Sequence, residues 1–361
     1  MRILHLSDRL SERGGAYQHL LGVLEAQVAQ EHHVTLAAGR ADEGVAAPCD
    51  VLTVPELDAR TSVEVDLDPL VDALAPDVMH LHTVVNPAAL RWAGRHGAVM
   101  TVQDHRYFCP GRGKWTLAGE ICRVAPSLEA CAACFEDASY FEEIQGLTRE
   151  RLEALKELRV VVLSRYMRDE LVAAGLDGAR VTVVPPFVRG LSHVAAEGPD
   201  CVLFVGRLVA GKGPLEAAHA WHESGVDLPL VVAGAGPLRP DLERLGARVV
   251  GWVGRAGLAV LLARARVLVM ASRWQEPFGI AGLEALASGV PVAAWDSGGV
   301  RDWHPGDGLA PWGDVPALAQ AIRALVGRRA AAPAGFERER LMARLHDVYA
   351  GAAPSRQARA S

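Results

Sequence analysis

The sequence predicts an α/β protein with two parallel β-sheets, each covered by helices. Short apolar runs, typical of buried strands, alternate with helical patterns along the chain. This alternation favours parallel sheets, because a helix carries the chain from the end of one strand back to the start of the next. With 361 residues, 50% of them hydrophobic, the chain is long enough for two domains with sizeable cores.

The expected strands fall into two groups along the chain. The first group covers residues 2–6, 33–37, 78–81, 99–102 and 160–163, and the second covers 201–205, 230–233, 248–250, 267–270 and 290–293. Between them, residues 181–188 contain two adjacent prolines, which cannot continue a central strand. We therefore expect one Rossmann-like domain over 1–187 and a second over 188–335. Residues 336–350 have an amphipathic pattern and predict a helix, and residues 351–361 predict a flexible tail.

Composition excludes several classes of protein. The formal net charge of −6 offers no general attraction to nucleic acid or to anionic lipid. No apolar run approaches the about 18 residues that a transmembrane helix needs. The sequence begins directly with a strand pattern and not with a cationic, apolar leader. We therefore expect a cytoplasmic protein without a nucleic-acid partner or a transmembrane segment.

The most informative segment spans residues 272–302. It places Glu276 in a loop after a strand and Glu284 on the following helix, about 7 Å further along the helix axis at about 1.5 Å per residue. The backbone N–H groups of Phe278, Gly279 and Ile280 are expected at the start of that helix, where a phosphate binds well. Carboxylates beside a phosphate site are suited to accept hydrogen bonds from sugar hydroxyls. The segment therefore predicts a nucleotide-sugar site.

The same segment carries a family resemblance. E-P-F-G-x-x-x-x-E followed by A-x-x-S-G-x-P-V-x-x-x-x-x-G-G resembles the signature of glycosyltransferase family 4 in the GT-B superfamily. The resemblance implies two Rossmann-like domains that face each other across a cleft. It also implies that Glu276 contacts the donor sugar and that Glu284 holds the nucleotide ribose. In family members, a C-terminal helix such as 336–350 crosses back to the first domain.

Further motifs of the second domain resemble the donor site of that family. Residues 206–213 resemble its G-R-x-x-x-x-K-G loop, in which Arg207 and Lys212 would meet the two donor phosphates. Cations at that place stabilise the charge that develops on a diphosphate leaving group. Trp252 stands where the family usually has phenylalanine, so a nucleobase contact and a place in the core both stay open. The donor-binding residues implied in this domain also include Gly206, Gly234 and Val253.

The first domain carries weaker signals. Gly14 and Gly15 precede a helical pattern and resemble the glycine pair that approaches the donor phosphates in the family. His82 belongs to an H-x-H pattern at the end of a strand, and we expect it on the acceptor side. The H-x-H pair alone does not make a metal site, because a metal ion needs further ligands.

Residues 101–110 match a family segment with one departure. Gln103 replaces the histidine that usually touches the donor sugar, whereas Asp104 follows the pattern. Gln103 can still donate a hydrogen bond to a hydroxyl, but it cannot ionise. We expect Asp104 and His105 in the cleft, together with the catalytic set Glu276, Arg207 and Lys212, and Arg106 on the acceptor side.

Four cysteines form an insertion between 109 and 134, with one close C-x-x-C pair. Four thiols with this spacing can build a structural zinc site, remain free or form disulfides, and the sequence leaves these alternatives open. The members of the cluster are Cys109, Cys122, Cys131 and Cys134.

The resemblance implies a retaining glycosyltransferase that transfers a hexose from an NDP-sugar to an acceptor hydroxyl and needs no cofactor for the chemical step. The acceptor is left open among small molecules, natural products and glycans. The alternatives are a GT-B epimerase and a non-catalytic module that binds a nucleotide sugar or a metal. A dehydrogenase is disfavoured, because neither half has G-x-G-x-x-G after its first strand.

Overall fold

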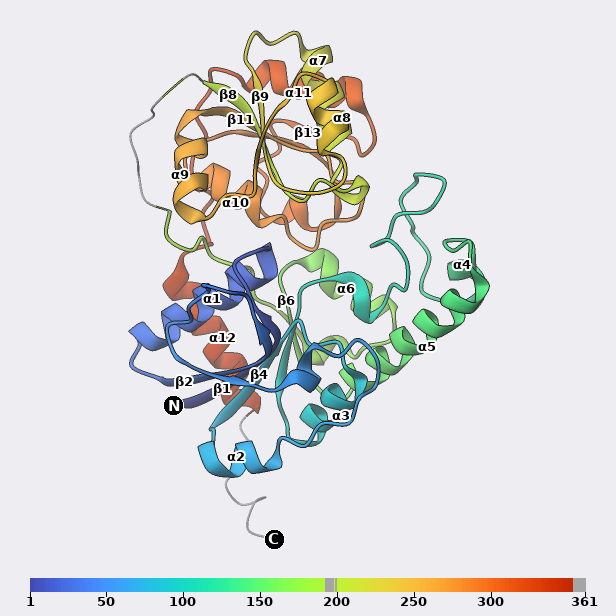
Figure 1. Ribbon diagram of the computed structural model, residues 1–361, viewed down its shortest axis with the longest axis vertical. Helices are drawn as coiled ribbons and strands as arrows, with labels where there is room; N and C mark the ends of the chain where they lie inside the picture. The colour runs from blue at the N-terminus through green and yellow to red at the C-terminus, as the bar shows by residue number, and fades with distance from the viewer. Residues whose placement is uncertain (192–197, 199, 353–361) are drawn as a thin grey trace. The chain divides into compact units, whose positions relative to one another are not determined.

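The computed structural model describes residues 1–191, 198 and 200–352, and the chain forms two compact units. Unit 1 comprises Met1–Phe187 with Phe336–Ser361, and unit 2 comprises Val188–Gly335. The division falls directly after the two prolines at 185 and 186. Each unit has its own parallel sheet with helices packed around it, so the predicted α/β class is confirmed (Figure 1).

Unit 1 contains a sheet of seven parallel strands in the order β3-β2-β1-β4-β5-β6-β7. Because chain order reverses between β1 and β4, these two neighbours form the topological switch point of the sheet. The strands are β1 (Arg2–Leu10), β2 (His33–Ala41), β3 (Asp50–Thr53), β4 (Val78–His82), β5 (Val99–Val102), β6 (Arg159–Val162) and β7 (Val181–Val183).

The helices of unit 1 begin at local sequence signals. The Asn86 side chain accepts a hydrogen bond from Ala88 N at the start of α3, and Ser164 caps α6 through Met167 N. The helices are α1 (Gly15–Ala29), α2 (Asp68–Leu74), α3 (Pro87–Arg95), α4 (Leu128–Ala132), α5 (Ala138–Leu155), α6 (Arg165–Ala173) and α12 (Arg338–Ala352), with short 3₁₀ turns η1 (Pro55–Asp58), η2 (His105–Tyr107) and η3 (Gly178–Arg180).

The C-terminal helix α12 belongs to the core of unit 1. It forms two residues later at each end than the 336–350 that the pattern predicts. Leu341, Leu345 and Tyr349 are buried in one cluster with Ile3 and Val99 of the sheet. The expected tail begins at residue 351, but 351 and 352 are helical, and residues 353–361 lie outside the described part of the chain.

Unit 2 repeats the same architecture with six parallel strands in the order β10-β9-β8-β11-β12-β13. Its switch point lies between β8 and β11. The strands are β8 (Cys201–Val205), β9 (Leu230–Ala233), β10 (Arg248–Gly251), β11 (Ala265–Met270), β12 (Val292–Trp295) and β13 (Leu309–Ala310). The helices are η4 (Ala210–Lys212), α7 (Pro214–Ser224), α8 (Arg239–Arg244), α9 (Arg255–Arg264), α10 (Ile280–Ala287), η5 (Gly298–Asp302) and α11 (Val315–Leu325).

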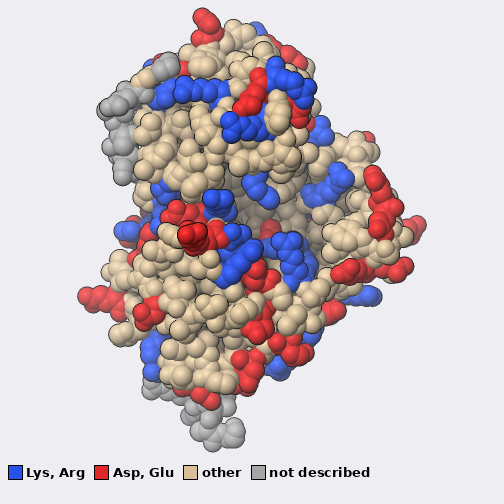
Figure 2. Space-filling view, viewed as in Figure 1, with Lys and Arg blue, Asp and Glu red and all other residues tan. Residues whose placement is uncertain are grey.

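The distribution of charged side chains on the surface agrees with the small net charge. On the face shown in Figure 2, lysine and arginine side chains are intermixed with aspartate and glutamate in both units. Among the described residues, no helix combines the length and the apolar character that crossing a membrane requires.

Candidate active site

The candidate donor site lies at the switch point of the unit 2 sheet. The loop after β8 carries Arg207 and Lys212, and the loop after β11 carries Glu276 and leads into α10. Loops at the carboxyl ends of two neighbouring strands on either side of a switch point form the usual ligand crevice of an open α/β sheet. The topology therefore brings together residues that are far apart in the sequence.

Lys212 and Glu276 form the centre of this site. Lys212 Nζ lies 2.7 Å from Glu276 Oε1, and the glutamate is only 3% exposed. Ser272 Oγ and Trp274 Nε1 donate to the same oxygen, the latter at 3.0 Å. Burial would raise the pKa of Glu276, but the ammonium and the three hydrogen bonds outweigh it and hold the pKa below its usual value. Glu276 is therefore an ionised carboxylate.

Trp274 connects this carboxylate with both phosphate-binding candidates. The Lys212 ammonium lies 4.5 Å from the centre of the indole ring, and the Arg207 guanidinium lies 5.0 Å from it. Both distances are in the range of cation–π attraction. Arg207 is exposed and forms no ion pair with a carboxylate of the described residues. The indole ring thus contacts two cations while its N–H donates to Glu276.

The turn at 297–299 supports the Glu276 loop from behind. Ser297 Oγ donates to Trp274 O at 2.7 Å, and Gly299 N donates to Glu276 O at 2.7 Å. A side chain at Gly298, whose φ is 53°, would meet Glu276 O at 2.4 Å. The glycine lets two loops approach more closely than any other residue would allow.

Glu284, the predicted ribose ligand, faces a cation that the sequence did not single out. It lies on α10, is buried, and forms an ion pair with Arg255 of α9. Arg255 also donates to Arg189 O. Burial raises the pKa of Glu284, and Arg255 opposes the shift.

The helix α10, the predicted phosphate-binding element, begins at a glycine with a left-handed backbone. Gly279 caps the helix with φ 94°, and Ile280 is its first residue, one later than predicted. Trp303 Nε1 donates to Phe278 O at 2.6 Å and so fixes the entry of the chain into the helix. The N–H groups at this end therefore lie next to the Glu276 loop.

The remaining donor candidates of unit 2 lie at strand ends. Gly206 directly follows β8, and Gly234 directly follows β9. A Cβ on Gly234 would meet Gly206 O at 1.8 Å, so only glycine permits this approach. Trp252 is 43% exposed and Val253 adjoins it, so the tryptophan does not belong to the core.

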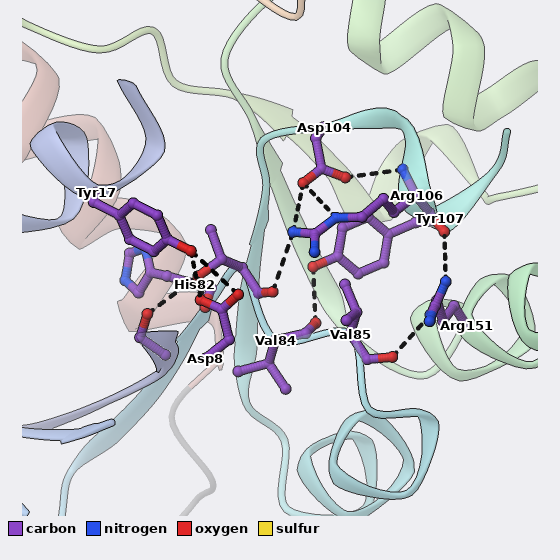
Figure 3. Close-up of polar contacts among 11 residues, drawn as sticks. Asp8, Tyr17, His82, Val84, Val85, Asp104, Arg106, Tyr107 and Arg151 are labelled. Atoms are coloured by element: carbon purple, nitrogen blue, oxygen red, sulfur yellow. Dashed lines mark hydrogen bonds and ion pairs between the residues drawn. The ribbon is translucent and has the colours of Figure 1, made fainter. Parts of the chain in front are cut away.

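In unit 1, the switch point between β1 and β4 carries a second polar group (Figure 3). Asp8, 7% exposed, accepts a hydrogen bond from Thr83 Oγ1 at 2.5 Å and from Tyr17 OH at 3.3 Å. Burial raises the pKa of Asp8 in spite of these donors. Burial of Tyr17 itself, together with the charge of Asp8, raises the pKa of Tyr17 to about 12.

Asp104 and Arg106 form a pair of their own. Arg106 Nε lies 2.8 Å and its terminal nitrogen 2.7 Å from Asp104 Oδ2. Burial would raise the pKa of Asp104, but Arg106 holds it below its usual value. Arg106 therefore has its charge already balanced. His105 is 7% exposed, and its Nε2 lies 3.0 Å from Tyr166 OH.

Gln103 and the glycine pair also lie at the carboxyl edge of this sheet. Gln103 follows β5, is 7% exposed, and neither atom of its amide has a partner among the described residues. Gly14 caps α1 with φ 129°, and Gly15 is the first residue of that helix.

His82, expected on the acceptor side, is fully buried in a cluster with His5 and His80. One tautomer, with Nε2 protonated on each ring, satisfies the network. In it His82 donates to His5 at 3.0 Å, and Tyr349 donates to His80 Nδ1 at 2.7 Å. Further donations run from His5 to Gln27 and from His80 to Thr101. Only His82 Nδ1 lacks a partner among the described residues, so hydrogen bonds account for the cluster without a metal ligand.

The four clustered cysteines are free thiols in the structure. They lie near one another, and their proximity contributes to the raised pKa of Cys131 and Cys134, whose main cause is burial. Among the described residues, the one group of three side chains close enough to share a metal ion is the histidine cluster. The zinc site that the spacing of the cysteines allowed stays a prediction.

Comparison with known proteins points to glycosyltransferases. Residues 199–328 match the family model of glycosyl transferases group 1. The alpha-D-kanosaminyltransferase of Streptomyces kanamyceticus is 34% identical over 140 residues, which cover 35% of this chain and 36% of that enzyme. The GDP-mannose-dependent alpha-(1-6)-phosphatidylinositol dimannoside mannosyltransferase of Mycobacterium tuberculosis is 28% identical over 273 residues, covering 72% and 68%. The chain is thus similar in sequence to known glycosyltransferases. The sucrose-phosphate synthase of Thermosynechococcus elongatus shares its fold with a TM-score of 0.63 at 19% identity, and the alignment covers 97% of both chains.

Three residues near the candidate sites were not predicted from the sequence. They are Trp274, Arg255 and Asp8. Trp274 lies two residues before Glu276 and could have been noticed as an aromatic beside a phosphate loop. Arg255 and Asp8 carry no local signal, because their importance comes from partners that are distant in the sequence.

Proposed function

We propose that the chain transfers a hexose from an NDP-sugar to an acceptor hydroxyl with retention of the anomeric configuration, as in glycosyltransferase family 4. The main support is the convergence of two cations on Trp274 and Glu276 at the switch point of unit 2. This is the charge pattern that a diphosphate leaving group and a sugar hydroxyl require.

Each side chain has a role in the proposed donor complex. Arg207, Lys212 and the start of α10 bind the diphosphate. Among the described residues, the donors to the Glu276 carboxylate all reach Oε1, which leaves Oε2 to accept a hydrogen bond from a sugar hydroxyl. Glu284 accepts hydrogen bonds from the ribose, with Arg255 holding its carboxylate in place.

The proposed step breaks the bond between C1 of the sugar and the phosphate oxygen, and its electrons leave with the diphosphate. The acceptor oxygen bonds to C1, and its proton passes to an oxygen of the leaving phosphate. The transition state resembles an oxocarbenium ion. Arg207 and Lys212 stabilise it, because negative charge grows on the diphosphate as the bond breaks.

The relatives support this class of donor and leave the acceptor open. One is a GDP-mannose-dependent mannosyltransferase and the other a kanosaminyltransferase, so both transfer a sugar. We propose a small molecule, a natural product or a glycan as acceptor.

Product analysis tests the proposed stereochemistry. Incubation with α-linked UDP-, GDP- and ADP-sugars and an acceptor panel is followed by NMR of the new anomeric proton. An α-linked product supports the retaining reaction. A β-linked product excludes it, and a donor epimer formed without any transfer points to an epimerase.

A further inference from the structure

We infer that Asp8, at the switch point of the unit 1 sheet, is the anchor of the acceptor subsite and binds a hydrogen-bond-donating group, a hydroxyl or an ammonium, of a pyranose-like acceptor. That the ligand of this subsite is the acceptor of the reaction rests on the proposed transferase function. The existence of the subsite rests on unit 1 alone.

The position of Asp8 is the first argument. Ser7 is in register with His82, the last residue of β4, so Asp8, near the carboxyl end of β1 (Arg2–Leu10), lies beside Thr83, which directly follows β4. Chain order reverses between these two strands, and ligands of open α/β sheets bind outside the carboxyl ends at such a point. The candidate donor residues of unit 2 occupy the corresponding place beside β8 and β11. The chain thus carries polar groups at the ligand-binding place of both sheets.

The state of the Asp8 carboxylate is the second argument. It is 7% exposed, and no cation of the described residues forms an ion pair with it. The guanidinium of Arg106, whose charge acts on Asp8, is itself balanced by Asp104 (Figure 3). Among the described residues, Asp8 Oδ2 accepts only one contact, from Tyr17 OH at 3.3 Å. A buried carboxylate with an unfilled oxygen gains most from an added donor, and most of all from a charged one.

Unsatisfied polar atoms around the switch point are the third argument. His82, directly before Thr83, has a buried Nδ1 without a partner among the described residues. Gln103, after the neighbouring strand β5, has both amide atoms buried and without a partner there. Buried polar atoms are rarely left unpaired, so groups of this kind indicate a ligand or ordered water. A ligand with several hydroxyls can supply both donors and acceptors, as these side chains require.

The same groups predict which ligands are disfavoured. With Arg106 neutralised by Asp104, Asp8 leaves a net negative charge at the switch point. A phosphate or carboxylate placed there would meet like charge, whereas an ammonium or a hydroxyl would be attracted. The subsite is therefore specific for neutral or cationic sugar rings.

Binding to the full chain without donor tests the inference. The probes are glucose, glucosamine and glucose 6-phosphate, which share a ring and differ in one group, and saturation-transfer NMR measures their dissociation constants. We expect glucose or glucosamine to bind, and glucose 6-phosphate to bind more weakly than either. Tighter binding of glucosamine identifies an ammonium at Asp8, and equal binding identifies a hydroxyl. If none of the three binds, or if the phosphate binds best, the inference is wrong.

Two variants locate the binding. Asp8→Asn keeps the size of the side chain but removes its charge, and we expect about a tenfold or greater loss of affinity. Asp77→Asn is the matched control, because Asp77 Oδ2 binds Arg2 N at the opposite edge of the sheet. Tyr17→Phe, which leaves the carboxylate in place, is expected to change affinity only a few-fold and guards against a folding defect in Asp8→Asn. Equal affinity in wild type and Asp8→Asn would overturn the assignment.

The outcome is separable from the proposed function. If no NDP-sugar is turned over but the sugar probes bind in an Asp8-dependent way, the transferase proposal fails and the subsite stands. If NDP-sugars are turned over and Asp8→Asn raises KM for donor and acceptor alike, the subsite fails and the transferase stands.

Discussion

Lys212 Nζ lies 2.7 Å from Glu276 Oε1, although the two residues are 64 positions apart in the sequence. Each explains the state of the other. The ammonium keeps a 3% exposed carboxylate ionised, and the carboxylate holds the ammonium over the face of Trp274. A diphosphate that binds here meets a lysine already in position, so little side-chain entropy is lost on binding.

Trp274 should matter as much as the charged residues. Trp274→Leu removes the ring that contacts both cations and the N–H to Glu276, so kcat/KM for the donor should fall about 10- to 100-fold. Trp274→Phe keeps an aromatic face and should lose less. Trp221→Phe serves as the control, because its N–H bonds Leu228 O away from this site. Equal activity in Trp274→Leu and wild type would show that the indole positions nothing.

Nucleotide binding should depend on the protonation of Glu284. Burial raises the pKa of this carboxylate and Arg255 opposes the shift, so Arg255→Gln should raise it further. Since ribose hydroxyls bind the ionised form, NDP affinity should fall as pH decreases, and the fall should begin at higher pH in the variant. Titration of NDP between pH 5 and pH 8 measures this. Arg266→Gln, which loses only an exposed pair with Asp200, should leave the pH profile unchanged.

The hydroxyl of Tyr349 should contribute to the stability of unit 1. It donates to His80 at 2.7 Å and accepts from Gln27 Nε2 at 3.1 Å, and all three side chains are buried. Tyr349→Phe leaves both partners unsatisfied and should lower the free energy of unfolding by about 1–3 kcal/mol. Tyr140→Phe, at a 53% exposed position, should change it by less than about 0.5 kcal/mol. Urea denaturation of both variants gives the comparison, and equal effects would argue against the network.

The histidine cluster predicts a loss of stability in mild acid. Burial lowers the pKa of His5 to about 4 and holds the pKa of His80 and His82 well below the usual value. Because the unfolded chain then binds more protons than the folded one, stability falls as pH decreases from about 6.5 towards 4. His5 alone accounts for up to about 3 kcal/mol across that window, given its pKa of about 4.

Denaturation midpoints between pH 4 and pH 7 check this expectation. Replacing a cluster histidine, as in His80→Gln, should flatten the pH dependence, whereas replacement of the exposed His219 by Gln should not. A stability that is independent of pH over this range would contradict the account.

The sequence alone predicted the layered parallel sheets and most strands, because alternating apolar runs and helices report burial directly. It missed β3, whose four residues are all exposed, and β13, whose two residues are too few to form a pattern. It also missed β7, because the prolines that follow it directed attention to the domain boundary.

The site was predictable where its chemistry is local. The order of Glu276, Gly279 and Glu284 in one segment indicated a loop, a helix start and a helix face, and the structure has these elements in that order. The contacts of His82 were not predictable, because its cluster is completed by His5 and by a tyrosine more than 260 residues away. The places of Arg255 and Asp8 at the two candidate sites likewise become visible only when the strand order is known.

Release of nucleoside diphosphate from a panel of UDP-, GDP- and ADP-sugars tests the central claim most directly. The assay compares wild type with Lys212→Ala, with and without acceptor. Lys156→Ala is the surface control, because it loses only a pair with Glu153. The account predicts that wild type and Lys156→Ala release diphosphate from the same donor and that Lys212→Ala loses about 100-fold or more in rate. Equal rates in Lys212→Ala and wild type, or no release from any donor, would contradict it.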